Sequence, residues 1–148
     1  MNKIILVLSF VVFGIIFVIL GREELNMARK SEKWPFADGI IVKSNVKISR
    51  RYRGEYYADI VYEFDVAGKR YHGDKITFGG ECVDMSCVYN IVRNEYPKNK
   101  RVKVYYDPDN PEISILEPGV RAITYFPLGG GILFLLIGIS VLLSHVKF

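Results

Sequence analysis

The side chains best suited to acid–base chemistry or metal binding are gathered in one short stretch of the sequence. His72 is followed by Asp74, and two further carboxylates, Glu63 and Asp65, come shortly before it. A carboxylate beside a histidine can act as an acid–base pair or supply metal ligands. A metal site needs three or more converging ligands, however. We therefore favour a charge ladder across two strands on a solvated sheet face and keep a His72-centred site as the alternative.

The two cysteines, Cys82 and Cys87, are separated by four residues. This spacing differs from the C-x-x-C pattern of redox and zinc sites, and no second Cys/His pair completes a tetrahedral ligand set. In an oxidising compartment we expect a disulfide that closes this short loop. In the cytoplasm we expect two reduced, partly buried thiols instead. The choice depends on the compartment.

Other patterns that carry chemistry are missing from the sequence. No serine lies in a glycine-flanked elbow, and Gly79 and Gly80 are not followed by the Gly-Lys-Ser/Thr of a phosphate-binding loop. Residues 21–121 carry 18 basic and 16 acidic side chains, a net charge of only +2, which is too low for a nucleic-acid-binding surface. We therefore expect no catalysis, no cofactor and no nucleic-acid partner.

The elements that must position these residues are mostly strands. Residues 56–66 alternate over 11 positions, the strongest secondary-structure signal in the chain. The even-numbered side chains share one face: Tyr56, Ala58, Ile60, Tyr62, Phe64 and Val66. A turn at 67–69 and a returning strand at 70–78 complete a hairpin. Further strands are expected at 40–49, with a break near Ser44, at 101–106 and at 113–116, and a short helix at 87–95 with Ser86 as its N-cap.

The charges are confined to the middle of the chain. Residues 4–20 and 122–144 contain no charged side chain, whereas residues 21–121 hold 34 of the 36 charges. A helix of 17 residues covers about 25 Å, close to the hydrocarbon thickness of a membrane, and the second run is long enough to span it. We expect an uncleaved signal anchor at the N-terminus, with a cleaved signal as the alternative, because the apolar run is long and lacks a small-residue cleavage site.

These patterns divide the chain into four parts. We predict a transmembrane signal anchor at 1–21, a helical stalk at 22–33, a β-rich extramembrane domain at 34–121, and a transmembrane helix with a short tail at 122–148. The fold class is α+β: a small, mostly antiparallel domain with one short helix, flanked by two transmembrane helices.

Small residues in the two apolar runs predict that the helices contact each other. Residues 129–131 and Gly138 leave shallow backbone faces, and Ser9 and Gly14 are candidate partners on the first helix. The same helices could form a homo-oligomer. We place the termini in the cytoplasm and the domain outside it, in the inner membrane, because Lys3, His145 and Lys147 lie beside the outer ends of the two apolar runs. The basic residues that follow the first run carry less weight, because a loop longer than about 60 residues is translocated largely regardless of its charge.

Several segments of the middle region resemble the bacterial domain of unknown function 3592 (DUF3592) family. The matching segments are Trp34-Pro35, Gly39-Ile40-Ile41, residues 57–71 with Gly73, Tyr96-Pro97, residues 104–108, Asn110-Pro111 and residues 116–119. The resemblance covers residues 34–119, and its closing signature is the specific part. It implies a compact β-rich extramembrane domain in a bacterial envelope. It supplies no activity, substrate or catalytic residue.

We therefore predict a two-span, membrane-anchored interaction module, such as an accessory, adaptor or immunity-like protein of the bacterial envelope. Its partners would be the lipid bilayer and another membrane or envelope protein. The interaction surface is expected at strand edges or at an aromatic and basic set: Tyr56, Tyr57, Tyr62, Arg51 and Tyr52. The alternative is an envelope metal-binding sensor or enzyme centred on His72 with Glu63, Asp65 and Asp74.

Overall fold

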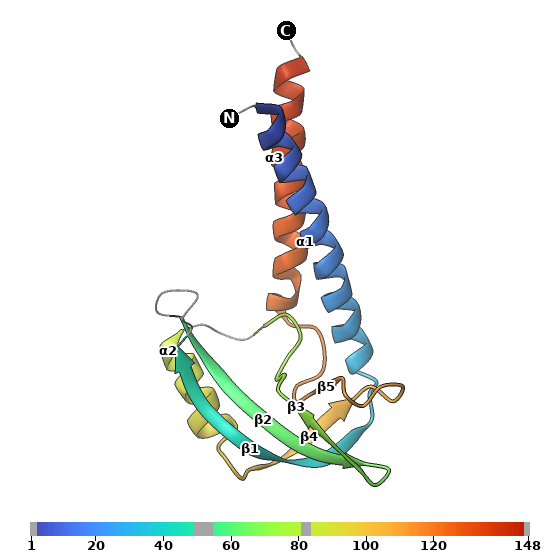
Figure 1. Ribbon diagram of the computed structural model, residues 1–148, viewed down its shortest axis with the longest axis vertical. Coiled ribbons are helices and arrows are strands. Elements are labelled where there is room, and N and C mark those ends of the chain that lie inside the picture. The colour runs from blue at the N-terminus through green and yellow to red at the C-terminus, as the bar shows by residue number, and fades with distance from the viewer. Residues whose placement is uncertain (1–2, 49–54, 81–83, 147–148) are drawn as a thin grey trace.

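A computed structural model describes residues 3–48, 55–80 and 84–146 of the chain. Two long helices stand side by side, and a curved sheet lies at one end of them (Figure 1). These helices are α1, Lys3–Ser31, and α3, Phe126–Val146, which follows a short 3-10 helix, η2, at Ala122–Tyr125. Both termini lie at the end of the helix pair that is far from the sheet (Figure 1).

The sheet has five strands in the order β3-β2-β1-β4-β5, and every pair of neighbours is antiparallel. The strands are β1 Phe36–Ile48, β2 Tyr56–Val66, β3 Lys69–Gly73, β4 Arg101–Tyr106 and β5 Ser114–Ile115. A short helix, α2 at Met85–Asn90, continues as a π-helical turn, η1, at Ile91–Glu95. The predicted α+β class with a mostly antiparallel sheet and one short helix is confirmed for this domain.

Strand β2 supplies the centre of the hydrophobic core. Its even-numbered side chains Ile60, Tyr62 and Phe64 are buried, as their alternation predicts, and they pack in one cluster with Ile41 and Val104 from the neighbouring strands. Ile91 of η1 covers the same cluster. Burying a large apolar side chain stabilises a fold by about 1.5–3 kcal/mol, so this face of β2 fixes the register of the sheet.

The returning strand is shorter than predicted. We expected it to reach Phe78, but β3 ends at Gly73. Beyond this point the chain leaves the sheet and pairs elsewhere: the N–H of Glu117 donates to the carbonyl of Ile76 at 2.8 Å, and the N–H of Leu116 to that of Lys75 at 3.3 Å. The alternation of residues 74–78 could not distinguish a continued hairpin from this new pairing.

Two local features lie at positions other than those predicted. The irregularity expected near Ser44 lies instead between Ile41 and Lys43, where β1 has one extra residue opposite β2. The N-cap of α2 is Asp84 and not Ser86, because the Asp84 carboxylate accepts a hydrogen bond from the N–H of Cys87. The Ser86 hydroxyl donates to the same carboxylate, and this hydrogen bond lowers the pKa of Asp84.

A second buried cluster joins the helices to the sheet domain. Ala28, near the end of α1, packs with Trp34, Phe78 and Ile115, and the rings of Trp34 and Phe78 meet edge to face with centroids 5.9 Å apart. The hydroxyl of Ser31 accepts a hydrogen bond from the N–H of Gly119. Helix α1 is continuous through this junction, so its apolar part is held in a fixed position relative to the sheet.

Glycines let α1 and α3 approach closely, as the small residues predict. A Cβ atom added to Gly14 would lie 3.1 Å from the carbonyl oxygen of Gly131, and one added to Gly131 would lie 2.8 Å from the backbone nitrogen of Val18. Gly138 also faces α1, whereas Gly129 and Gly130 face open space. Only some of the glycines that were predicted to contact the other helix therefore do so.

Residues 122–143 form a helix that is long and apolar enough to cross a membrane, with a mean hydropathy of 2.3. Within the described residues no second helix meets the same criterion of length and composition. The prediction of a membrane segment is thus supported for the C-terminal helix, and a span formed by α1 stays a prediction.

Candidate functional site

The sheet has one face that is not used for the core. Cross-strand pairing places on it the odd-numbered residues of β2 and their partners on β1, β3 and β4. We call this set the open face: Asp38, Ile40, Lys43, Asn45, Lys47, Tyr57, Asp59, Val61, Glu63, Asp65, Arg70, His72, Arg101 and Lys103. Most of its side chains are charged, as expected for a sheet face in contact with water.

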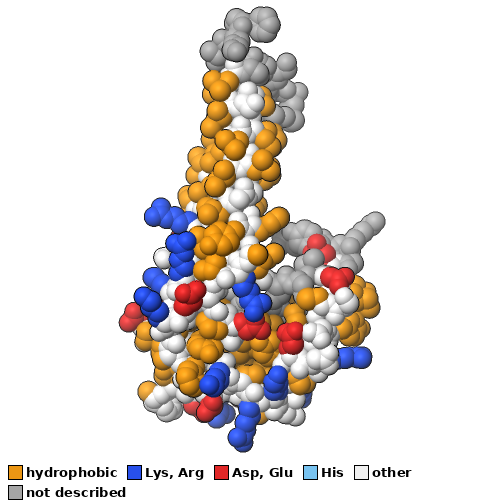
Figure 2. Space-filling view, turned by 180° about the vertical axis from the view of Figure 1, so that it is seen from behind, with side chains coloured by type: hydrophobic (Ala, Val, Ile, Leu, Met, Phe, Trp, Pro, Cys, Tyr) orange, Lys and Arg blue, Asp and Glu red, His pale blue; other side chains and the backbone are white. Residues whose placement is uncertain are grey.

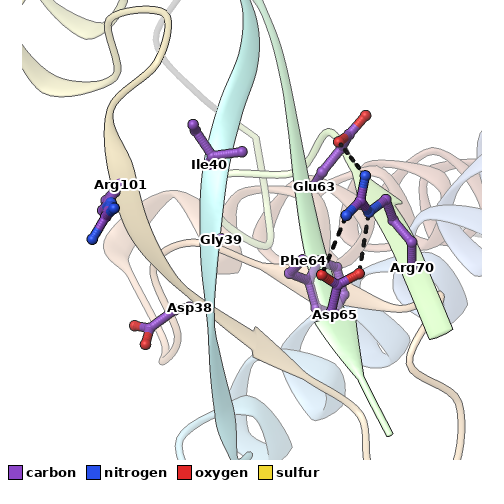
Figure 3. A pocket seen from close by; sticks show the side chains of 8 residues that line it. All are labelled: Asp38, Gly39, Ile40, Glu63, Phe64, Asp65, Arg70 and Arg101. Carbon is purple, nitrogen blue, oxygen red and sulfur yellow. Dashed lines mark hydrogen bonds and ion pairs between the residues drawn. The ribbon is translucent and has the colours of Figure 1, made fainter. Parts of the chain in front are cut away.

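The predicted polar cluster lies on the open face, and the register of the hairpin decides its pairing. His72 is opposite Glu63, with His72 Nε2 2.9 Å from Glu63 Oε1, and Arg70 is opposite Asp65. The Nε of Arg70 donates to Asp65 Oδ1 at 3.1 Å, while its Nη1 lies 3.8 Å from Glu63 Oε2. The hydrogen bond and negative charge of Asp65 raise the pKa of Arg70. Arg70 thus lies between both carboxylates (Figure 3).

This arrangement is a ladder of ion pairs across two strands. Asp74 lies beyond the end of β3 and takes part in none of the ion pairs between described residues. Among the described residues no group of three or more His, Cys, Asp or Glu side chains is placed to hold a metal ion. The geometry therefore gives the His72-centred alternative no third ligand within that part of the chain.

A second set of ion pairs lies further along β1 and β2. The ammonium groups of Lys43 and Lys47 lie 2.7 Å and 2.6 Å from the same oxygen of Asp59, Oδ2. The Asp59 side chain is only 17% exposed. The two lysines lower the pKa of Asp59, and Asp59 in turn raises the pKa of Lys47.

A shallow groove of about 410 Å³ lies beside the first set, across β2, β1 and β4, and Glu63, Asp65 and Arg70 form one of its walls. Its walls include Asp38, Ile40 and Arg101, and none of the ion pairs between described residues involves Asp38 or Arg101. Ile40 is 39% exposed at the centre of this charged surface. In Figure 3 Asp38 and Arg101 lie apart from Arg70 and its two carboxylate partners and point away from them.

These three groove residues were not predicted from the sequence. They come from β1 and β4, which are about 60 positions apart in the chain, and Asp38 pairs with Lys103 while Ile40 pairs with Arg101. The alternation of each strand indicates which of its residues share a face. It carries no information on which strands are neighbours, so no local signal could have joined these residues.

The predicted tyrosine surface is wrong for Tyr62. This residue is fully buried, and its hydroxyl donates to the carbonyl of Lys75 at 3.0 Å and lies 3.3 Å from Ser114 Oγ. Burial raises the pKa of Tyr62. Tyr56 is half-buried on the core side of β2, whereas Tyr57 is 44% exposed on the open face. Arg51 and Tyr52 lie outside the described residues.

The predicted cysteine pair is only partly described. Cys87 lies in the first turn of α2, packs against the main core and is not a free thiol. Cys82 lies outside the described residues, so the pairing of these two cysteines stays a prediction.

The domain that carries the open face matches a known sequence family. Residues 37–121, more than half of the chain, match the pattern described as "Domain of unknown function (DUF3592)". The chain belongs to this family. The match confirms the resemblance seen in the sequence. In this chain the DUF3592 region comprises almost all of the sheet together with α2 and η1, and it excludes α1 and α3. No curated protein and no solved structure matches the chain.

Proposed function

We propose that this DUF3592 chain is a two-span membrane protein that binds another membrane or envelope protein through its open face. The observation that carries the proposal is the groove, in which the exposed Ile40 is flanked by Asp38 and Arg101. The opposite face of the same strands is occupied by the core. The open face is therefore the broad surface on which the sheet can bind a partner.

Membrane anchoring is supported by the outer surface of the helix pair. Helix α1 exposes large apolar side chains over residues 5–20, among them Leu8, Phe13 and Ile19. Helix α3 does the same at Leu133, Leu136 and others. Figure 2 shows this apolar surface continuing along the pair, with charged side chains gathered near the domain. A soluble protein rarely exposes such a large apolar surface, whereas lipid would cover it.

The charges of the open face suit recognition better than catalysis. Exposed ion pairs such as those of Arg70 contribute little to stability, so a partner can exchange them for its own contacts at small cost. Complementary charges increase the rate and specificity of association, and an apolar side chain at the centre adds buried area. We infer a partner with both acidic and basic groups around an apolar side chain, and no catalysis by this chain.

The proposed setting is the inner membrane of a bacterial cell, with both termini in the cytoplasm and the domain outside it. Long loops translocate largely regardless of their charge, and the N-terminal apolar run has the length of an uncleaved anchor. The partner is then sought among proteins with an extracytoplasmic surface.

Site-specific photocrosslinking in cell membranes tests the proposal. A benzophenone amino acid at Ile40 should form a discrete crosslinked product with one partner. The same amino acid at Glu112, which is exposed in a turn away from the groove, should not. Arg101→Glu, combined with the probe at Ile40, should reduce the product at least threefold. Equal products at both positions, or none at Ile40, would overturn the proposed interface.

A further inference from the structure

A second groove lies where the helix pair meets the sheet domain. It has a volume of about 510 Å³ and is lined by α1, by Pro127 at the start of α3, by the segment after β3, and by Ile113 just before β5. We call it the junction groove. Its lining runs along α1 from apolar Phe17 to acidic Glu23 and Glu24. Figure 2 shows the apolar surface of the helix pair giving way to charged side chains near the domain. If the helices span a membrane, this level is that of the lipid head groups.

The walls of the junction groove change character along α1. Phe17 and Leu20 line its end toward the helix pair, and Glu23 and Glu24 follow one turn later. Residues three or four positions apart lie on one side of a helix, so the apolar and acidic walls form one continuous strip. Phe78 continues the apolar wall on the domain side. The groove is therefore amphipathic along its length.

One acidic group is used within the fold and the other is not. Glu24 Oε2 accepts a hydrogen bond of 2.7 Å from the N–H of Gly79. None of the ion pairs between described residues involves Glu23 or Lys75, both of which line the groove. The backbone of Lys75 is held by the hydroxyl of Tyr62, and its ammonium lies 5.5 Å from the centroid of Phe78. The site thus has a carboxylate and an ammonium available for a ligand.

We infer that the junction groove binds a zwitterionic phospholipid with a primary amine in its head group. The lipid ammonium binds the carboxylate of Glu23, and its phosphate binds the ammonium of Lys75. An acyl chain lies along Phe17 and Leu20. Two carboxylates and one ammonium give the groove a net negative charge, which disfavours an anionic lipid. A choline head group has no N–H to donate to Glu23. The inference rests on the proposed membrane anchoring but not on the proposed protein partner.

Native mass spectrometry of the full chain in detergent tests this inference. The probe is an equimolar mixture of phosphatidylethanolamine, phosphatidylglycerol and phosphatidylcholine. We expect the ethanolamine lipid to be retained at least threefold more than either of the others. Glu23→Gln and Lys75→Gln should each reduce its retention at least threefold. Asp109→Asn and Lys98→Gln, which remove exposed charges outside the groove, are the matched controls and should leave retention unchanged.

Three outcomes would overturn the inference: equal retention of the three lipids, preference for the anionic lipid, or equal loss in the groove and control variants. These results are separable from those on the proposed function. Loss of the Ile40 crosslink leaves the lipid measurement unaffected. Extraction of the chain from membranes by alkaline carbonate would instead contradict the anchoring itself.

Discussion

Gly73 controls how closely the end of β3 approaches the core. A Cβ atom at this position would lie 2.4 Å from two ring carbons of Tyr62 and 2.5 Å from Ser114 Oγ. The ring cannot easily move away, because its hydroxyl is hydrogen-bonded to the carbonyl of Lys75. We predict that Gly73→Ala destabilises the chain by about 1–3 kcal/mol. Thermal unfolding in detergent measures this, with Gly130→Ala, which faces open space, as the matched control. Equal midpoints would contradict the packing described.

Asp59 should make the stability of the domain sensitive to acid. Lys43 and Lys47 lower the pKa of Asp59. The contribution of its carboxylate to the free energy of unfolding is therefore complete above the ordinary carboxyl pKa of about 3.9 and is lost as the pH falls through the lowered pKa. We predict that Asp59→Asn is less stable than the natural chain at pH 7 and that the difference shrinks below about pH 4. Urea unfolding across this range measures it. Asp109→Asn, in an exposed turn, is the matched control.

At the scale of elements, alternation predicted strand β2 well, but it did not predict where β3 ends or where β1 has its extra residue. Eleven alternating residues fixed the bounds of β2 and the side of it that is buried. The same alternation already placed Tyr62 with Ile60 and Phe64, and its burial shows that a surface role for an aromatic residue cannot be inferred from its type. The end of β3 and the position of the extra residue in β1 depend on backbone pairing with distant segments, which leaves no local sequence pattern.

The helix pair depends on Gly131, which faces the backbone of α1. A leucine there would force the helices apart, because the backbone nitrogen of Val18 and the carbonyl oxygen of Gly14 are among the three nearest atoms and backbone atoms cannot move aside. We predict that Gly131→Leu destabilises the pair by about 1–3 kcal/mol. Gly130→Leu, one position away and facing open space, should have little effect. The efficiency of a disulfide crosslink engineered between α1 and α3 measures this loss of contact between the helices. Unchanged crosslinking in Gly131→Leu would show that this glycine does not set the distance between the helices.

At the scale of the whole molecule, composition predicted the partition into apolar helices and a polar domain, but not how the parts meet. The open-face groove joins Ile40 to Arg101, and the junction groove joins α1 to Lys75 and Phe78. Each combines segments that are distant in the sequence. The candidate sites are therefore properties of the tertiary packing, whereas the His72–Glu63 ladder belongs to a single hairpin and could be expected from its sequence.

The arrangement of the termini gives the last prediction. Both lie at the same end of the helix pair (Figure 1), so two spans would place both on one side of the membrane and the domain on the other. We predict that epitope tags on both termini react only after lysis. In intact cells, Cys82 and Cys87 should react with a membrane-impermeant maleimide only after reduction. A single tag accessible in intact cells would exclude two spans. Cysteine labelling only after lysis, without a reductant, would leave the spans intact but reverse the orientation. The tags thus test the number of spans, while the cysteines test the side on which the domain lies.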